Sequence, residues 1–297
     1  MKLGMIGLGR MGANMTKRLT GGGHAVVAWS HGNAAAAARD AGAEWAASPE
    51  DLLRALPKPA VVWLMIPAGA PVDETLAALR PGLAAGDVVI DGGNSFYRDS
   101  MRRAGELGER GVFYLDAGTS GGVWGLENGY CLMVGGDAGA VERVRPIFET
   151  LAPENGFARV GASGAGHYVK MVHNGIEYAM LQSLGEGFEI LNASEFSLDL
   201  PQIAGIWRYG SVVRSWLLDL LSDALGKDPK LERIRGWVDD SGEGRWTLKE
   251  AIDHAVPAPA LADALFARFR SRQADSFSAR AIAALRNEFG GHAVKKS

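Results

Sequence analysis

The sequence contains a single cysteine and no long apolar run, and each absence narrows the class of protein. Because Cys131 stands alone, no disulfide can form within the chain, and we expect a reducing compartment, the cytoplasm. Its apolar neighbours predict that Cys131 is a core residue. No run of about 18 apolar residues occurs, so no membrane span is expected. The opening MKLGMIGLGRMG is broken by glycines and lacks a cleavage pattern, so it is not expected to be a signal peptide.

The chain also lacks a large excess of positive or of negative charge. The formal net charge is -3 and no cluster of Lys and Arg dominates, which argues against nucleic acid as a partner. With 47% hydrophobic and 22% charged residues, the chain has ample material for a globular core. Its 297 residues exceed the size at which one core usually stops growing, so two domains are expected.

Short apolar runs alternate with helical segments in the first part of the chain. The runs are KLGMIG, HAVVAW, AVVWLMI, DVVIDGG, VFYLDAG and CLMVGG. Such runs, separated by helices, are typical of a mainly parallel sheet covered on both faces. Beyond Gly161 the apolar pattern is helical almost throughout. The sequence therefore predicts an α/β fold: a Rossmann-type doubly wound parallel sheet in residues 1–163, then an all-helical domain for substrate binding and oligomerisation in residues 164–297.

The hexapeptide GLGRMG follows the first apolar run and opens a helix. Gly7, Gly9 and Gly12 fit the G-x-G-x-x-G pattern, in which glycines allow a tight turn and the helix N-terminus faces a pyrophosphate. This context predicts a dinucleotide site.

The end of the second strand bears on the choice of dinucleotide. An NAD site usually carries an acid there to bind the ribose hydroxyls, but this turn reads WSHGN, residues 29–33. Without a carboxylate, nothing repels a 2′-phosphate. We expect NAD or NADP as the cofactor, with a slight preference for NADP, although an ordinary surface turn explains the same residues equally well.

Two further motifs stand where strands are expected to end. They are DGGNSFYRD, residues 91–99, and DAGTSGGVWGLENG, residues 116–129. In open α/β sheets the ligand crevice lies outside the carboxyl ends of the strands, so Asn94 and Ser120 are in place to reach substrate and nicotinamide. Ordinary turn chemistry is the alternative, because Gly, Asn and Ser are common in turns.

The stretch KMVHNGIEY places four polar side chains on one side of a predicted helix. Lys170, His173, Asn174 and Glu177 stand at i, i+3, i+4 and i+7 and form one stripe. The opposite side carries the apolar residues Val172, Ile176 and Ala179. If that side faces the core, the stripe is a solvated surface. Its mixture of base, acid, amide and imidazole instead favours a functional site.

Four motifs, taken in order, strongly resemble the 6-phosphogluconate dehydrogenase family, the decarboxylating enzymes of the β-hydroxyacid dehydrogenase superfamily. They are GLGRMG, DGGNS, TSGG and GAGHYVKMVHNGIEY. The resemblance covers essentially the whole chain, which is similar to the short, bacterial-type form. It implies oxidative decarboxylation of 6-phosphogluconate to ribulose 5-phosphate and CO2 with reduction of NAD(P)+, a step of the pentose phosphate pathway. It also implies a homodimer or a higher even homo-oligomer with shared active sites.

The resemblance implies a role for individual residues. Lys170 is expected to be the general base and Glu177 the general acid, with His173 and Asn174 beside them. The expected substrate contacts are Asn94, Ser120, Gly121, Gly122, Tyr178, Arg268, Arg286 and His292, the last two reaching into a partner's site. The expected cofactor contacts are Gly7, Gly9, Arg10, Met11, Gly12, Ser30, His31, Asn33, Met65 and Asn94, and no metal is expected.

One segment departs from the family pattern. Where longer members carry a Lys and a Thr for the phosphate, DDSGEGRWT has Ser241 and Glu243. The details of phosphate binding are therefore expected to differ.

Two other functions remain as alternatives. A non-decarboxylating 3-hydroxyacid dehydrogenase shares the glycine loop and a helix lysine, but Glu177 supplies the acid that decarboxylation needs, and Arg268 and Arg286 favour a phosphorylated substrate. A catalytically silent dinucleotide-binding sensor is disfavoured because Lys170, Asn174, Glu177 and Ser120 occur together.

Overall fold

The computed structural model describes residues 1–32 and 34–295. Asn33, one of the predicted cofactor contacts, lies outside the described residues. The chain divides into two compact units, Met1–His173 and Asn174–Ser297. The helix α8 (Ala165–Asn192) runs across this division. The domain boundary expected between residues 163 and 164 stays a prediction.

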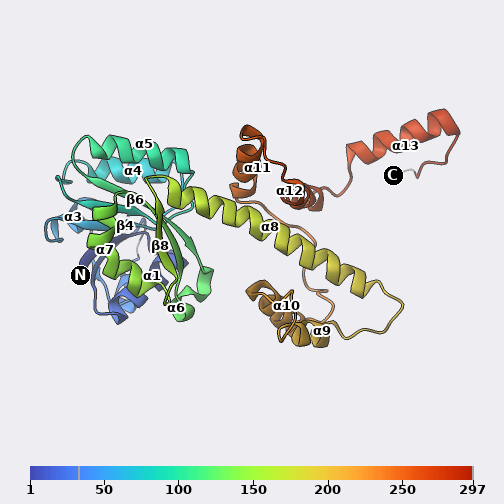
Figure 1. Cartoon of the computed structure of the whole chain (residues 1–297), viewed down its shortest axis with the longest axis horizontal. Helices are drawn as coiled ribbons and strands as arrows, with labels where there is room; N and C mark the ends of the chain where they lie inside the picture. The colour runs from blue at the N-terminus through green and yellow to red at the C-terminus, as the bar shows by residue number, and fades with distance from the viewer. Residues whose placement is uncertain (33, 296–297) are drawn as a thin grey trace. The chain divides into compact units, whose positions relative to one another are not determined.

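The first unit is built on an eight-stranded sheet in the order β3-β2-β1-β4-β5-β6-β7-β8 (Figure 1). All neighbouring strands pair in parallel except β6 and β7, which are antiparallel. The strands are β1 (Lys2–Ile6), β2 (Ala25–Trp29), β3 (Glu44–Trp45), β4 (Val61–Leu64), β5 (Val88–Asp91), β6 (Phe113–Ser120), β7 (Cys131–Gly135) and β8 (Phe157–Gly161). The predicted, mainly parallel sheet is confirmed.

Helices cover both faces of this sheet. The core on one face includes Met15 and Phe148, which come from α1 (Arg10–Gly21) and α7 (Ala138–Leu151). The core on the other face includes Leu52, Leu76 and Leu107, from α3 (Pro49–Arg54), α4 (Ala70–Leu79) and α5 (Tyr97–Gly108). A short helix, α2 (Ala35–Asp40), adds Ala38 to the first of these cores. The doubly wound arrangement is therefore also confirmed, and it leaves the carboxyl ends of the strands open to a ligand.

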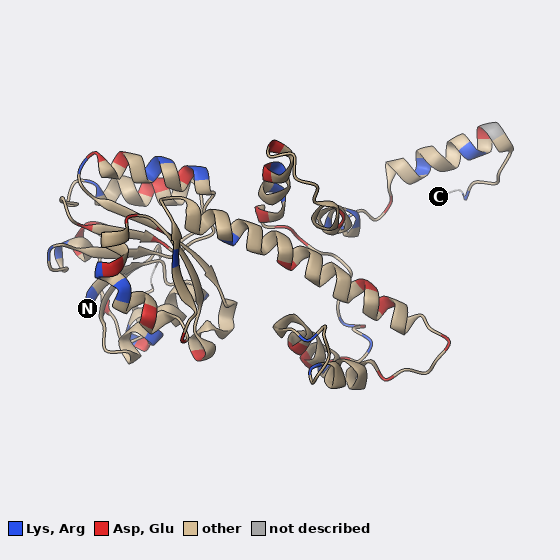
Figure 2. Ribbon diagram, in the orientation of Figure 1, with Lys and Arg blue, Asp and Glu red and all other residues tan. Residues whose placement is uncertain are grey.

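Charges of both signs are interspersed on this unit, as α5 illustrates (Figure 2). Arg102 of α5 donates hydrogen bonds to Glu106, one turn further on, and to Asp73 of α4. Such mixed pairs are typical of a solvated protein surface rather than of a phosphate-binding face.

The second unit consists of helices joined by loops, with no strand among its described residues. After the second part of α8 come α9 (Leu200–Trp207), α10 (Trp216–Lys227), α11 (Glu243–Asp253), α12 (Pro259–Ser271) and α13 (Phe277–Gly290). Asp199, Ser215 and Ser276 cap three of these helices by accepting a backbone N–H three residues on. The cores are small: Phe188, Ala204, Leu218 and Leu225 form one, and Tyr178, Ala264 and Leu265 form another. None of the helices that the structure describes has the length and hydropathy to cross a bilayer.

Three features differ from the sequence predictions or were not predicted. Cys131 is exposed, so its prediction as a core residue is wrong. It begins β7 opposite Ser120, the last residue of β6, and at this end of the ladder its side chain is open although Leu132 is buried. The strands β3 and β8 were not predicted. Two short helices also follow β6, the 3-10 helix η1 (Gly122–Trp124) and α6 (Gly125–Asn128).

Candidate active site

The glycine loop between β1 and α1 has the close backbone packing that its sequence predicts. Gly7 has φ +100°, and a Cβ there would overlap the carbonyl oxygen of Met65. A Cβ at Gly12 would overlap the carbonyl oxygen of Gly7. Gly9 differs, because a Cβ there would meet nothing within 4 Å, and as the N-cap of α1 it brings no capping side chain. Space is therefore open beside Gly9 at the N-terminus of α1, which fits the pyrophosphate of a dinucleotide.

The turn after β2 offers polar groups without a carboxylate in its described part, residues 29–32. Ser30 is half-buried and His31 is exposed. The His31 ring lies edge-on to Trp29, with 4.7 Å between the ring centroids. Arg10, the first residue of α1, is exposed as well. These groups fit the ribose of either NAD or NADP.

The loops after β4 and β5 pack against each other at the carboxyl edge of the sheet. A Cβ at Gly93 would stand 2.8 Å from the carbonyl oxygen of Ile66, and one at Gly92 would overlap the indole nitrogen of Trp63. Glycine is therefore required at both positions. Met65 is half-buried in the first loop, and Asn94 is exposed in the second.

Asp91 shapes the Asn94 loop and was not predicted as a site residue. Its buried carboxylate accepts hydrogen bonds from the Gly93 N–H at 3.1 Å, the Ser95 hydroxyl at 2.7 Å and the Tyr114 hydroxyl at 2.6 Å. Burial and the Asp91 charge raise the pKa of Tyr114 well above its ordinary value, so the phenol stays a donor. Arg103 of α5 approaches the same carboxylate at 3.8 Å. The sequence signal is an acid at the end of a buried strand, directly before two glycines.

The loop after β6 lies at the same edge. Ser120 ends the strand, and Gly121 and Gly122 follow with φ values of +132° and +53°, which glycine adopts without strain. Asn14 of α1 donates a hydrogen bond to the carbonyl of Val123 at 3.2 Å. The Ser120 loop is therefore tied to the helix that follows the glycine loop.

The polar stripe of α8 is the buried side of that helix. Lys170 is 7% exposed and Asn174 is 9% exposed, whereas Ile176 is 51% exposed and Met180 is 42% exposed. His173 and Glu177 are half-buried. The alternative of a solvated stripe is therefore excluded, because all four polar side chains are buried or half-buried. On the opposite side Ile176 is exposed, and Val172 and Ala179 are half-buried.

Within the first unit, His173 links Lys170 to Ser120. The Lys170 amine lies 3.4 Å from His173 Nδ1, and the Ser120 hydroxyl lies 3.4 Å from His173 Nε2. One tautomer satisfies both contacts: Nδ1 accepts from the lysine, and the Nε2–H donates to the serine. Three predicted site residues are thus brought together by β6 and α8.

The second unit gathers part of the predicted phosphate site. The Arg268 guanidinium lies 3.4 Å from the centroid of the Tyr178 ring and donates to the carbonyl of Asp239. The Tyr178 hydroxyl accepts the N–H of Ser241 at 3.3 Å. Glu243, the first residue of α11, is buried.

The two remaining predicted residues lie at the C-terminal helix. Arg286 is exposed on α13, and His292 follows the cap residue Gly291. The proposed role of this pair in a partner's site stays a prediction.

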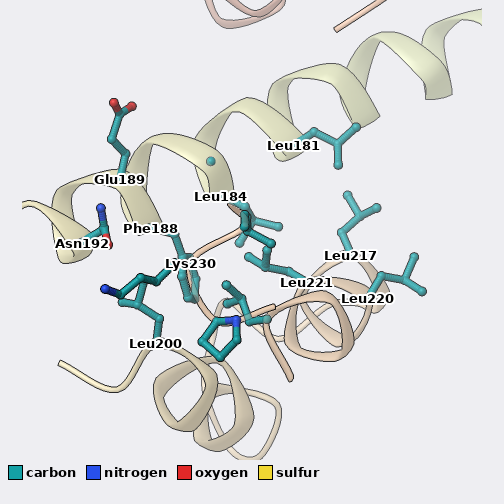
Figure 3. A pocket seen from close by; sticks show the side chains of 14 residues that line it. Leu181, Leu184, Phe188, Glu189, Asn192, Leu200, Leu217, Leu220, Leu221 and Lys230 are labelled. Carbon is teal, nitrogen blue, oxygen red and sulfur yellow. The ribbon is translucent and has the colours of Figure 1, made fainter. Parts of the chain in front are cut away.

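A large pocket of the second unit, about 510 Å³ in volume, is chemically different from these loops (Figure 3). It lies among α8, α9 and α10, and its walls are mainly leucines with Phe188. Such a lining suits apolar side chains rather than a sugar acid. None of the predicted site residues lines it. Among the residues that the structure describes, no group of three or more His, Cys, Asp or Glu is arranged to hold a metal ion.

Comparison with known proteins relates this geometry to a family. Residues 2–162 match the NAD binding domain of 6-phosphogluconate dehydrogenase, and residues 166–195 match the C-terminal domain of the same enzyme. The chain is 46% identical to YqeC of Bacillus subtilis over the full length of both chains. It is also 46% identical to the NAD(+)-dependent, decarboxylating 6-phosphogluconate dehydrogenase of Haloferax volcanii, covering 100% of this chain and 99% of that one.

Solved structures agree with the sequence matches. Plasmodium falciparum 6-phosphogluconate dehydrogenase superposes with a TM-score of 0.84 at 28% identity, covering 100% of this chain and 66% of that one. Mycobacterium tuberculosis 3-hydroxyisobutyrate dehydrogenase superposes with a TM-score of 0.71 at 25% identity, covering 96% and 99%. The chain therefore belongs to the 6-phosphogluconate dehydrogenase family, and it is an NAD(P)-binding dehydrogenase of the hydroxyacid dehydrogenase superfamily.

Proposed function

We propose that the protein oxidises and decarboxylates 6-phosphogluconate, with NAD+ or NADP+ as the oxidant, and releases ribulose 5-phosphate and CO2. The observation that carries this proposal is the buried polar stripe of α8, which sets a lysine and a glutamate on one rigid helix. The name of the Haloferax volcanii relative supports the decarboxylating reaction. The reaction would place the protein in the pentose phosphate pathway.

Lys170 is the general base of the oxidation. It removes the proton of the hydroxyl that is bonded to the carbon losing its hydride. A lysine can do this only in its neutral form, and burial favours that form because it penalises the ammonium charge. His173, 3.4 Å from the amine, restricts where the amine points.

The glycine loop and the N-terminus of α1 would hold the pyrophosphate of the cofactor. When bound, the nicotinamide accepts the hydride that leaves the substrate carbon. Ser30, His31 and Arg10 would contact the adenosine ribose, and the absence of an acid at residues 29–32 would admit a 2′-phosphate. Both NAD and NADP are therefore accepted, with a slight preference for NADP.

The second half of the reaction also uses α8. Oxidation at the carbon β to the carboxylate gives a β-keto acid, and Lys170, now protonated, donates to its ketone oxygen while CO2 leaves. The electron pair of the broken C–C bond forms an enediol. Glu177 then delivers a proton to carbon, from a position seven residues or roughly 10 Å further along the helix axis. Asn174 lies between the two groups and holds a substrate hydroxyl.

The substrate is bound from several elements. Its carboxylate binds at Ser120, Gly121 and Gly122. Asn94 lies between substrate and nicotinamide. Tyr178 and Arg268 bind the phosphate, for which a guanidinium is well suited. Ser241 and Glu243 replace the Lys and Thr of longer relatives, so the phosphate relies more on Arg268 and on Arg286 and His292 of a partner chain.

A single assay tests the proposal. The purified protein is mixed with 6-phosphogluconate and either NAD+ or NADP+, the nicotinamide absorbance is followed, and CO2 is trapped. Equal amounts of reduced cofactor and CO2 are expected. Reduced cofactor without CO2 would instead indicate a 3-hydroxyacid dehydrogenase, and bound cofactor without reduction would indicate a sensor.

A further inference from the structure

The helix that carries Lys170 begins without a capping side chain of its own. The residue before α8 is Gly164, which has φ +94°. The sheet supplies the missing cap. One carboxylate oxygen of Asp116, in β6, accepts the N–H of Gly164 at 2.7 Å, and the other accepts the N–H of His167 at 2.9 Å. Asp116 is fully buried, so both bonds are shielded from water.

Alternate residues of β6 meet α8 at regular intervals. Asp116 binds the backbone of His167, Gly118 lies beneath Lys170, and Ser120 lies 3.4 Å from the His173 ring. A Cβ at Gly118 would overlap the Cβ of Lys170. Every second residue of a strand points to the same face, and residues three apart lie on one side of a helix. The strand therefore fixes the position of the first turns of α8 along the helix axis and their rotation about that axis.

The other side of α8 is held by α5. The Ser100 hydroxyl lies 2.7 Å from His167 Nδ1, and both side chains are buried. The Tyr97 and Tyr168 rings meet edge to face at 5.0 Å. A Cβ at Gly166 would overlap the carbonyl oxygen of Asp116, so the helix backbone lies directly on the sheet.

We propose that Asp116 is a positioning residue of the reaction: by capping α8 from β6 it sets where the helix begins and so where the Lys170 amine stands. This inference rests on the proposed role of Lys170 as the base. Lys170 follows Gly164 by six residues, or roughly 9 Å of helix axis, so a shift of the first turn is transmitted to it directly. A misplacement of about 1 Å can slow a reaction by about a hundredfold.

Replacing the Asp116 carboxylate need not unfold the protein. Burial raises the pKa of Asp116, while the nearby His167 and the two backbone N–H groups act in the opposite direction. A neutral asparagine of the same shape removes the cost of burying the charge. It keeps one acceptor oxygen but its NH2 group cannot accept the second N–H.

The test compares Asp116→Asn with a matched control, Asp87→Asn. Asp87 is also fully buried and also accepts two backbone N–H groups, from Ala60 at 2.7 Å and Ala84 at 2.9 Å, in addition to pairing with Lys58. It lies just before β5, at the amino end of that strand, whereas the loops of the candidate site follow the carboxyl ends of the strands. Asp116→Asn is expected to lower kcat by roughly ten- to a hundredfold while the Kd for NAD(P) stays within about twofold. Asp87→Asn is expected to lower the melting temperature but to change kcat by less than about twofold.

Hydrogen exchange gives a readout that does not depend on turnover. In Asp116→Asn the amides of residues 164–170 should exchange faster than in the wild type, and in Asp87→Asn they should not. Gly118→Ala is a second variant with an intact cap, and its added methyl group should displace Lys170 and lower kcat with little change in cofactor affinity.

Equal losses of kcat in Asp116→Asn and Asp87→Asn, or unchanged exchange at residues 164–170, would overturn the positioning role. A wild-type protein that fails to oxidise 6-phosphogluconate would instead count against the proposed function. The exchange experiment would then still decide whether Asp116 anchors α8.

Discussion

The Lys170 side chain is buried on α8, with Gly118 beneath its Cβ and His173 beside its amine nitrogen. Lys170→Met keeps the length and apolar body of the side chain but cannot take a proton. We expect kcat to fall by about 100- to 10,000-fold, the range that a general base contributes. Cofactor affinity, measured by fluorescence titration with NADPH, should stay unchanged because the glycine loop is intact. Near wild-type turnover would remove Lys170 from the mechanism.

Glu177 is expected to act after CO2 has left. Glu177→Gln keeps the shape of the side chain but cannot deliver a proton to the enediol, so turnover should be severely slowed. Glu186, exposed nine residues further along the same helix, is the matched control, and Glu186→Gln should behave as the wild type. Both variants are compared by their kcat for 6-phosphogluconate. Equal kcat values in the two variants would assign the protonation to another group or to water.

Asp240 gives the second unit a predictable response to acid. Hydrogen bonds from Arg245 at 2.7 Å and Arg272 at 2.9 Å hold the pKa of Asp240 below its ordinary value, Arg245 having the larger effect. A depressed pKa in the folded state stabilises the fold above the unfolded-state pKa of about 3.9, and this stabilisation is lost as the pH falls. The urea midpoint of the wild type should therefore drop more steeply than that of Asp240→Asn below pH 4. Parallel curves for the two proteins would show that the pair does not contribute.

At the scale of elements, the strands that the sequence predicts are those buried on both faces. β4 and β5 are buried at every position, so they read as unbroken apolar runs. β3 has two residues, and β8 is mostly exposed, so neither produces such a run. They lie at the two edges of the sheet, where burial no longer dictates composition.

The candidate site was predictable only where its functional residues lie close together in the sequence, at a spacing that is typical of a loop or a helix. The glycine loop and the stripe of α8 are such patterns, and the structure shows the loop's close packing and the stripe's burial. Asp116 could not be found in this way, because its partner Gly164 lies 48 residues further along the chain. The spacing alone left open which side of α8 is buried, because a polar stripe is compatible with a solvated face as well as with a functional site.

The turn after β2 is the element that selects the cofactor. Ser30→Asp introduces the carboxylate that NAD-specific turns carry, and it should shift the ratio of kcat/KM toward NAD by repelling the 2′-phosphate of NADP. Ala25→Asp is the control, because it adds the same charge at the exposed first residue of β2. The ratio should not change in that variant. A wild-type protein that is strongly selective for NAD would show that the turn was misinterpreted.

At the scale of the whole molecule, the helical unit exposes much apolar surface. Ile206, Val212 and Trp216 are 60%, 101% and 46% exposed. A second pocket of about 490 Å³ is lined by Val212 and by other apolar side chains, among them Ile176 and Met180. The leucine-lined pocket of Figure 3 belongs to the same unit. Apolar surface of this kind marks an interaction site. We propose that a second copy of the chain covers it in a homodimer or a higher even oligomer.

This assembly would also complete the active sites, because Arg286 and His292 are proposed to reach the phosphate in a partner. If so, a site needs Lys170 from one chain and Arg286 from the other. Lys170→Met and Arg286→Ala chains, each nearly inactive alone, should regain about a quarter of wild-type activity after equal mixing and subunit exchange. Half of the dimers are then mixed, and each mixed dimer has one intact site of two.

The control mixes Lys170→Met with Glu177→Gln. Both of these residues serve the site of their own chain, so every site in this mixture lacks one of them and no activity should return. Subunit exchange is verified independently by native mass spectrometry of the mixed dimers. If exchange is complete and the Lys170→Met and Arg286→Ala mixture stays inactive, each chain supplies its own arginine and the sites are not shared.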